Sequence, residues 1–235
     1  MKPTTCLSII KASAFVCSLF VLLTLTSCDK EDSDSVNQDK IYTVYEFDYN
    51  KNSDITYARV WFRFGNLLGT PLELKEPATI TFNGDTMPFK SSLSYYELQF
   101  PGVLASGTFV YNDLNNDTYT NTITMAKVVD LPATVDTIVR SINNQLTCVG
   151  DSLGASEKFE TKVAGPNSND VQYFTTTGVG AHTVTLLSSQ LSLISPGMGT
   201  LKLEREYKPT LQQKTLAGGY ISSSYTALER AAYIQ

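Results

Sequence analysis

A strict alternation of apolar and polar side chains over residues 55–64 constrains the fold of this chain more than any other pattern in its sequence. Four apolar residues alternate there with four polar or aromatic ones: Ala58, Val60, Phe62 and Phe64 against Tyr57, Arg59, Trp61 and Arg63. Successive side chains of a β-strand point to opposite faces, so we expect the first set to face a core and the second to face away from it. Similar alternation recurs at residues 79–82 and 108–111. The sequence therefore predicts an all-β protein.

A weak internal repeat divides the rest of the chain into two halves. Pro101-Gly102 leads into residues 107–111, and Pro196-Gly197 leads into residues 199–203. Each segment can open the last hairpin of a β-sandwich, with return strands expected at residues 118–125 and 219–225. We therefore predict two tandem immunoglobulin-like β-sandwich domains, residues 41–127 and 128–235, with the boundary near Pro132 because proline cannot donate to a strand ladder.

One cysteine remains in the part of the chain that is expected to fold. Of the four cysteines, Cys6 and Cys17 lie in the hydrophobic N-terminal segment and Cys28 directly follows it, which leaves Cys148. No disulfide within the two domains is available, so they must be stabilised by their hydrophobic cores. We expect Cys148, within the sequence Leu-Thr-Cys-Val, to be a small buried hydrophobic residue rather than a nucleophile.

The N-terminal segment has the organisation of a secretory signal. Lys2 and Lys11 supply positive charge, residues 12–25 are mostly apolar, and small polar residues precede Cys28. This apolar run is too short to span a bilayer, which needs about 20 residues. We therefore expect residues 1–27 to be a signal peptide that is removed, and Cys28 to be lipid-modified.

The sequence around Cys28 resembles that of bacterial lipoproteins, which carry several acyl chains on this cysteine. Lys30-Glu31-Asp32 also resembles the acidic signal that sends lipoproteins of the Bacteroidetes to the outer face of the outer membrane. The resemblance covers only residues 1–35 and implies a lipid-anchored protein of the outer membrane that faces the cell exterior. Residues 28–40 are almost wholly polar, so we expect a disordered tether there. The alternative to an export signal is that the acidic residues are ordinary solubilising charges.

The overall charge argues against nucleic acid as a partner. The chain carries a formal net charge of −5, and loss of Lys2 and Lys11 with the signal peptide makes it more acidic. Nucleic-acid binding draws its affinity from clustered Lys and Arg, which neutralise phosphates. We therefore expect a membrane partner through the lipid and no nucleic acid.

One short motif raises the question of hydrolase activity. Gly150-Asp151-Ser152-Leu153 resembles the block that carries the serine nucleophile in a family of lipases and esterases. In that family the base is a histidine three residues after an aspartate, whereas Val179 stands three residues before His182, the single histidine here. Without a positioned base a serine hydroxyl is a weak nucleophile. We therefore expect no enzymatic activity, with a hydrolase using Ser152 as the weaker alternative.

A second motif bears on metal binding. Asp113, Asn115 and Asp117 place oxygen side chains at the first, third and fifth positions of a calcium-type loop. The sixth position is Thr118 rather than glycine and the twelfth is Thr124 rather than glutamate. A polar hairpin turn explains the three residues with fewer assumptions, so we expect no metal and no other cofactor.

The strand at residues 55–64 is the strongest candidate for a binding surface. An aromatic ring between two arginines, as in Arg59-Trp61-Arg63, can stack on a sugar while the guanidinium groups donate hydrogen bonds, and Tyr57 extends the row. The same residues can instead pack beneath a neighbouring loop as ordinary sheet stabilisers. The sequence thus predicts a non-enzymatic surface lipoprotein that binds a glycan or protein partner through a sandwich face. The alternative is a structural component of a cell-surface complex or a fimbria-like assembly.

Overall fold

The computed structural model describes residues 30–167 and 169–235, and these residues are nearly all β. The predicted signal peptide, residues 1–27, and the predicted lipidation site Cys28 lie outside the described residues. Among the described residues, no helix is long and apolar enough to cross a membrane. Helical structure there is limited to α1 (Ser188–Leu191) and two 3-10 turns, η1 (Ser33–Ser35) and η2 (Gln38–Lys40).

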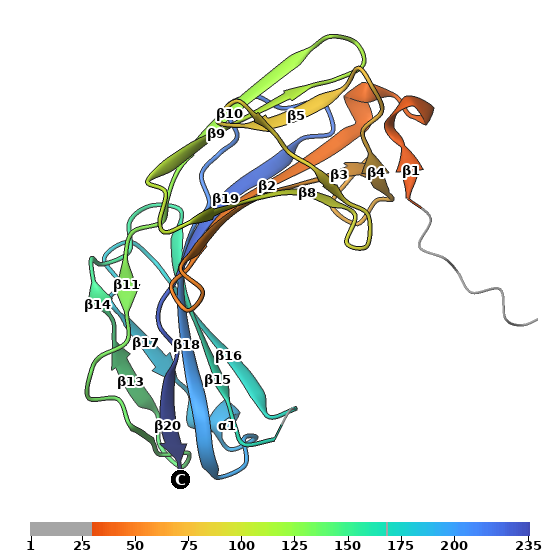
Figure 1. Cartoon of the computed structure of the whole chain (residues 1–235). Helices are drawn as coiled ribbons and strands as arrows, with labels where there is room; N and C mark the ends of the chain where they lie inside the picture. Colours follow the sequence, from red (N-terminus) through yellow and green to blue (C-terminus); the bar gives the residue numbers. More distant parts are fainter. Residues whose placement is uncertain (1–29, 168) are drawn as a thin grey trace, which may run out of the picture.

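One large sheet runs the length of the molecule and forms the inner layer of an arch (Figure 1). Its main path, in spatial order, is β1 (Glu31–Asp32), β4 (Pro71–Glu73), β3 (Ile55–Phe64), β2 (Ile41–Asn50), β19 (Gly219–Thr226), β18 (Gly197–Tyr207), β15 (Glu157–Ala164) and β16 (Val171–Thr177). Four further strands join it at the sides: β8 (Tyr95–Pro101), β7 (Phe89–Lys90), β20 (Arg230–Ile234) and β12 (Thr137–Ile138). We call this the inner sheet.

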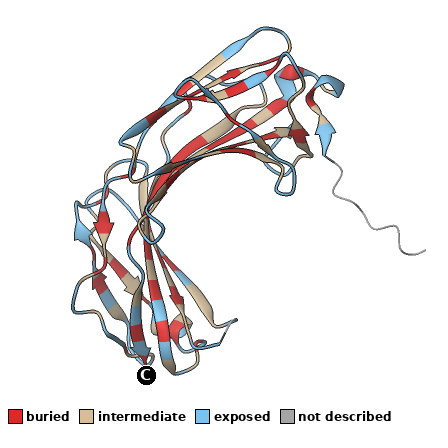
Figure 2. Cartoon of the chain, in the orientation of Figure 1, coloured by how far each residue is buried: buried red, intermediate tan, exposed pale blue. Residues whose placement is uncertain are grey.

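Smaller sheets cover the convex side of the arch and complete two sandwiches. The first outer sheet contains β10 (Thr118–Thr124), β9 (Ser106–Asn112), β5 (Thr79–Phe82) and β6 (Asp85–Thr86). The second half is covered by two strand pairs, β11 (Val129–Asp130) with β14 (Val149–Gly150) and β13 (Asn144–Thr147) with β17 (Thr183–Leu186). A separate hydrophobic core lies between the layers of each half, and Figure 2 shows the buried residues along both.

The strand predicted at residues 55–64 is confirmed as β3, with the expected alternation. Ala58, Val60 and Phe62 are fully buried in the first core, whereas Phe64 at the end of the strand is partly exposed. The predicted hairpin between residues 107–111 and 118–125 is also confirmed, as β9 and β10. Cys148 is buried in the second core, as expected.

The two halves do not have the separate sheets that tandem sandwiches would have. β19, predicted as the return strand of the second half, instead pairs in parallel with β2 over eight residues, from Gly219 opposite Thr43 to Thr226 opposite Asn50. It pairs with β18 only over Ser223 to Thr226. Residues 197–201 of β18 pair in antiparallel with β20 instead. The inner layers of both halves are therefore one continuous sheet.

The connection from β18 to β19 explains how the chain returns to the first half. It runs along β10, the open edge of the first outer sheet, where the buried Asn121 side chain accepts hydrogen bonds from the backbone N–H groups of Gln212 and Gln213. The side chains of the two glutamines bond in turn to backbone groups of Thr120 and Thr122. These contacts satisfy an edge that would otherwise be open to pairing with another chain.

The prediction of a disordered tether over residues 28–40 is wrong for the described part of that segment. β1 pairs in parallel with β4, and Lys30 and Lys75 form ion pairs with Glu73 and Asp32. The side chains of Ser33 and Gln38 are buried; Ser33 accepts a hydrogen bond from the backbone of Lys75, and Gln38 donates to the carbonyl of Ser33. The polar side chains order the segment by bonding to backbone groups, which composition does not reveal.

Arg205 provides a test of the second half of the fold. Its fully buried guanidinium donates hydrogen bonds to the carbonyl oxygens of Asp151 and Ser152 and pairs with Glu157. We expect Arg205→Met to lower the free energy of unfolding by about 3–5 kcal/mol, because it leaves the Glu157 carboxylate without its main partner. Urea denaturation measures this loss. Arg63→Met, which removes a single bond to a loop carbonyl, is the control, and an equal loss in both variants would contradict the prediction.

Candidate functional site

A polar groove lies at the centre of the inner sheet, on the concave face away from both cores. Its volume is about 450 Å³. The strands that line it are β3, β2, β19 and β18, and the residues are Glu46, Asp48, Tyr49, Asn50, Tyr57, Arg59, Lys202, Glu204, Glu206, Lys208, Tyr220, Ser222, Ser224 and Thr226. We call it the central groove. Burial alternates along β18 as it does along β3, and every second residue of β19 from Tyr220 to Thr226 points to this same face.

The strand register explains why these side chains meet. Ser224 lies opposite Asp48 in the parallel β19–β2 pair and opposite Glu206 in the antiparallel β18–β19 pair. Arg59 lies opposite Glu46 on one side and Glu97 on the other. Side chains that share a face of neighbouring strands lie close enough to interact. Residues from both halves of the sequence therefore line the same groove.

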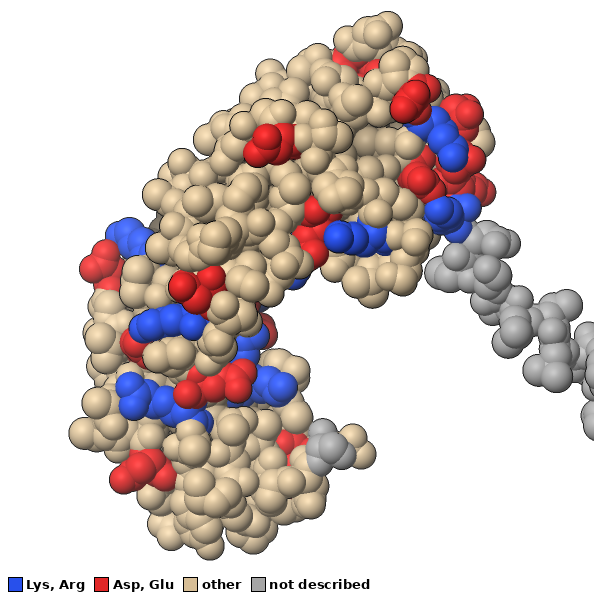
Figure 3. Space-filling model, in the orientation of Figure 1, with Lys and Arg blue, Asp and Glu red and all other residues tan. Residues whose placement is uncertain are grey.

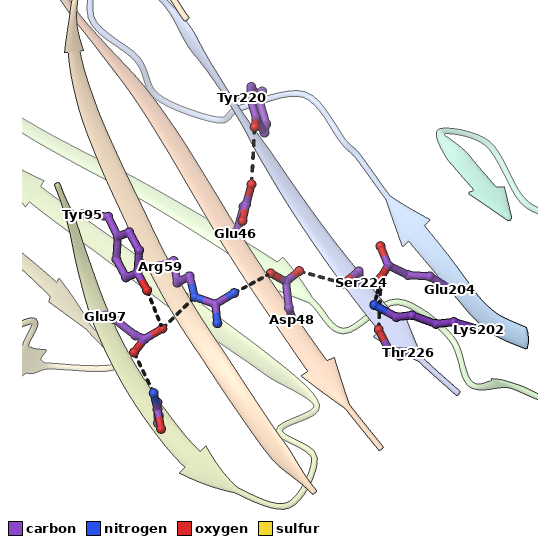
Figure 4. A network of polar contacts seen from close by, with 11 residues as sticks. Glu46, Asp48, Arg59, Tyr95, Glu97, Lys202, Glu204, Tyr220, Ser224 and Thr226 are labelled. Atoms are coloured by element: carbon purple, nitrogen blue, oxygen red, sulfur yellow. Dashed lines mark hydrogen bonds and ion pairs between the residues drawn. The ribbon is translucent and has the colours of Figure 1, made fainter. Parts of the chain in front are cut away.

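Arg59 is held in place by two carboxylates. Its Nε donates to Oε2 of Glu97 at 2.7 Å, and its Nη1 lies 3.6 Å from Oδ2 of Asp48. The guanidinium also lies over the Tyr57 ring, 4.3 Å from the ring centre. Glu97 is further held by Gln99 and Tyr95 (Figure 4). Although burial opposes it, the bond from Arg59 holds the pKa of Glu97 below its usual value. The groove therefore has a fixed cation on its β3 side.

Carboxylates dominate the rest of the groove floor. The Ser224 hydroxyl donates to Oδ1 of Asp48 at 2.8 Å, and Thr226 donates to Glu204 at 3.1 Å. Burial raises the pKa of Asp48 to about 7, with the nearby Glu46 charge adding to the rise; Ser224 and Arg59 oppose it. Burial likewise raises the pKa of Glu46. Two carboxyl groups of the groove therefore have raised affinity for protons.

Lysines and a tyrosine complete the β18 and β19 side. Nζ of Lys208 lies over the Tyr220 ring, 3.7 Å from its centre, and Lys202 lies 3.6 Å from Glu204. Lys158 pairs with Glu206 at 2.7 Å. Figure 3 shows lysine, arginine and acidic side chains interspersed along the inside of the arch. The groove thus presents cationic donors and anionic acceptors close to one another.

The four residues predicted as a binding row on β3 divide into two pairs. All four are on the face away from the core, as the alternation predicts. Tyr57 and Arg59 line the central groove. Trp61 packs against Tyr95, with ring centres 5.0 Å apart, and Arg63 donates to the carbonyl of Gly69 in the loop before β4. The sequence did not indicate the β2, β18 and β19 contributions, although Glu46, Asp48, Lys202 and Glu204 alternate with apolar residues.

The weak calcium candidate forms a turn at the tip of the β9–β10 hairpin. Oδ1 of Asp113 accepts hydrogen bonds from the backbone N–H groups of Asn115 and Asp117, each at 2.9 Å. Asn116 has a φ of 66°, which asparagine tolerates in turns. Within residues 30–167 and 169–235, no group of three or more His, Cys, Asp or Glu side chains is arranged to hold a metal ion.

Residues 150–153, the block that resembles the serine hydrolases, run from the end of β14 into the loop that follows it. Nε2 of His182 lies 2.8 Å from the carbonyl oxygen of Gly150. Because a carbonyl only accepts hydrogen bonds, His182 uses this nitrogen as a donor to the backbone of the block. Arg205 bonds to the next two carbonyls. The Asp151 side chain pairs with Lys127, and Ser152 takes part through its backbone carbonyl.

Comparison of the sequence with known protein families finds no match, and comparison with curated proteins finds none either. Among solved structures, the chain is weakly similar to a mutant of Salmonella alpha-2-macroglobulin. The TM-score is 0.23, and the sequence identity is 8% over 83% of this chain. The matched region spans 14% of that longer chain. A similarity this low carries no functional argument, so any function rests on the residues themselves.

The raised pKa of Asp48 predicts a pH-dependent contribution to stability. A carboxyl that titrates near pH 7 when folded and near 4 when unfolded makes the free energy of unfolding fall as the pH rises through that interval. Asp48→Asn removes this fall, so we expect it to stabilise the protein by about 4 kcal/mol more at pH 8 than at pH 4. Thermal unfolding at both pH values measures the difference. Asp85→Asn on the outer sheet is the exposed control, and identical pH profiles for wild type and Asp48→Asn would contradict the prediction.

Proposed function

We propose that this protein is a non-enzymatic, lipid-anchored surface protein that binds a glycan in the central groove. The observation that carries the proposal is the groove itself, an open hollow on a rigid sheet that is lined by tyrosines, hydroxyls, carboxylates and amines. A sugar presents many hydroxyl groups, each able to donate and accept hydrogen bonds. A lining of mixed donors and acceptors suits such a ligand better than an apolar one.

Preorganised side chains support binding of this kind. Arg59 is fixed between Asp48 and Glu97, so little conformational entropy is lost when it bonds to a ligand. Tyr57 and Tyr220 add aromatic surface at the two sides of the groove. Asp48 and Glu46 add acceptors whose charge falls as the pH drops. The arrangement suits a neutral or amine-bearing sugar better than a strongly acidic one, because four carboxylates line the groove against three cationic side chains.

The proposed location rests on the N-terminal sequence. Lys2, Lys11 and the apolar run before Cys28 support export and lipidation. Lys30-Glu31-Asp32 supports display on the outer face of the outer membrane, through the resemblance described above. A protein held on a cell surface gains from a groove that can retain soluble or polymeric glycans near the membrane.

A second candidate function is assembly into a larger surface complex. It is favoured by β16, the last strand on the path of the inner sheet, which pairs along one side with β15. An open strand edge can accept a strand from another protein. Pull-down from solubilised outer membrane tests this candidate, and a stoichiometric partner that is lost when Thr175→Pro disrupts β16 would support it.

A glycan array tests the main proposal. The wild-type chain should retain a glycan, and Tyr57→Ala and Arg59→Ala should each weaken its binding about tenfold or more, equivalent to ~1.4 kcal/mol. Trp61→Ala reports whether the site extends beyond the groove; unchanged binding would remove Trp61 from it. Tyr233→Ala, an exposed tyrosine on β20, is the matched control. The absence of any retained glycan, or full binding by both groove variants, would refute the proposal.

A further inference from the structure

One end of the inner sheet carries exposed leucines on three separate loops. Leu67 and Leu68 lie between β3 and β4, Leu93 lies between β7 and β8, and Leu216 precedes β19. Their exposed fractions are 46%, 92%, 60% and 87%. We call this set the leucine tip. Solvent-exposed leucines gathered at one end of a molecule mark a surface that contacts something apolar.

The strand register places these loops at the same end. β3 ends at Phe64 opposite Ile41, where β2 begins, and β19 begins at Gly219 opposite Thr43. β8 begins nearby, with Tyr96 opposite Val60. Gly65 donates to the carbonyl of Lys40, and Gly65 and Leu216 line one shallow hollow. The loop after β3 and the segment before β19 are therefore neighbours, and the turn between β7 and β8 lies at the same end of the sheet.

The described chain begins at this same end. β1 runs parallel to β4, so Lys30, the residue before β1, lies at the side from which the loop containing Leu68 enters β4. Lys30 is held there by its ion pair with Glu73. Cys28 is two residues from Lys30, and two residues span at most about 7 Å. A lipid on Cys28 would consequently hold the leucine tip close to the bilayer.

Charged residues of both signs lie near the tip. Lys30 and Lys75 are paired with Glu73 and Asp32, and the exposed Lys40 lines the hollow beside Leu216 together with the exposed Asp39. Binding to anionic lipids relies on clusters of cations without such acidic neighbours. Leucine side chains instead gain free energy by leaving water, whatever the headgroup charge.

We propose that the leucine tip enters the interfacial region of a phospholipid bilayer and docks the protein flush against the membrane. The inference rests on the lipid anchor in the proposed function, and its occupant is the bilayer rather than a second protein. The tip supplies a second membrane contact beside the acyl chains, and the ordered residues 30–40 leave no long tether between them.

Tryptophan quenching by brominated lipids tests the proposal. The mature chain, residues 28–235, is coupled through the Cys28 thiol to a maleimide lipid in phosphatidylcholine vesicles with brominated acyl chains. Cys148 stays unreacted because it is buried, and burial raises the pKa of its thiol to about 11. Trp61→Phe removes the native tryptophan, and Leu68→Trp or Leu216→Trp supplies the probe. Val179→Trp, in the loop between β16 and β17 and 77% exposed, is the control.

We expect the emission of both tip variants to shift to shorter wavelength and to be quenched, equally in neutral vesicles and in vesicles containing phosphatidylglycerol. The Val179→Trp emission should stay unquenched. Tip emission as unquenched as the control would overturn the proposal, and a blue shift without bromine quenching would overturn it in favour of a protein or a second copy. Chemical coupling supplies the anchor, so these outcomes are independent of native lipidation, which mass analysis of Cys28 tests, and of glycan binding.

Discussion

The pairing of β19 with β2 is the interaction on which the rest of the structure depends. It joins residues about 175 positions apart in the sequence, since Tyr220 lies opposite Val44 and Ser224 opposite Asp48. Through its last four residues β19 also pairs with β18. Without this strand the inner sheet would divide into two. The acidic residues of β2 and those of β18 would then no longer lie on the same face of one sheet. The arch and the central groove therefore share one structural cause.

Close approach at the start of this pairing leaves no room for a side chain. A Cβ on Gly219 would lie 2.1 Å from the carbonyl oxygen of Thr43, far inside contact distance. The hydroxyl of Thr215 donates to the carbonyl of Ile41, and the backbone of Ala217 bonds to that of Asp39. The segment before β19 is thus fixed to the start of β2 and to η2. Order in residues 30–40 and the position of β19 consequently support each other.

Local patterns predicted the strands and the β9–β10 hairpin, but not the pairing of strands that are distant in the sequence. The alternation at Ala58, Val60 and Phe62 gave the bounds and faces of β3 correctly because burial on one side of a sheet is a local property of the sequence. It could not predict that β19 crosses to the first half, since that depends on Asn121 bonding to Gln212 and Gln213. The same limit applied to most of the candidate site. Tyr57 and Arg59 were visible on one strand, whereas Asp48 and Glu204 become site residues only through long-range pairing.

The composition of the groove requires the rigidity that the continuous sheet provides. Glu46, Asp48, Glu204 and Glu206 repel one another, and burial adds a desolvation cost that raises the pKa of Asp48 and Glu46. Four adjacent strands with fixed register oppose this repulsion, and Arg59 and Lys158 offset part of it through ion pairs. Repulsion within such a cluster lowers the stability of the fold. Carboxyl groups with perturbed pKa values are typical of functional sites. The four carboxylates that the sheet holds close together are therefore the strongest physical reason to regard the groove as a binding site.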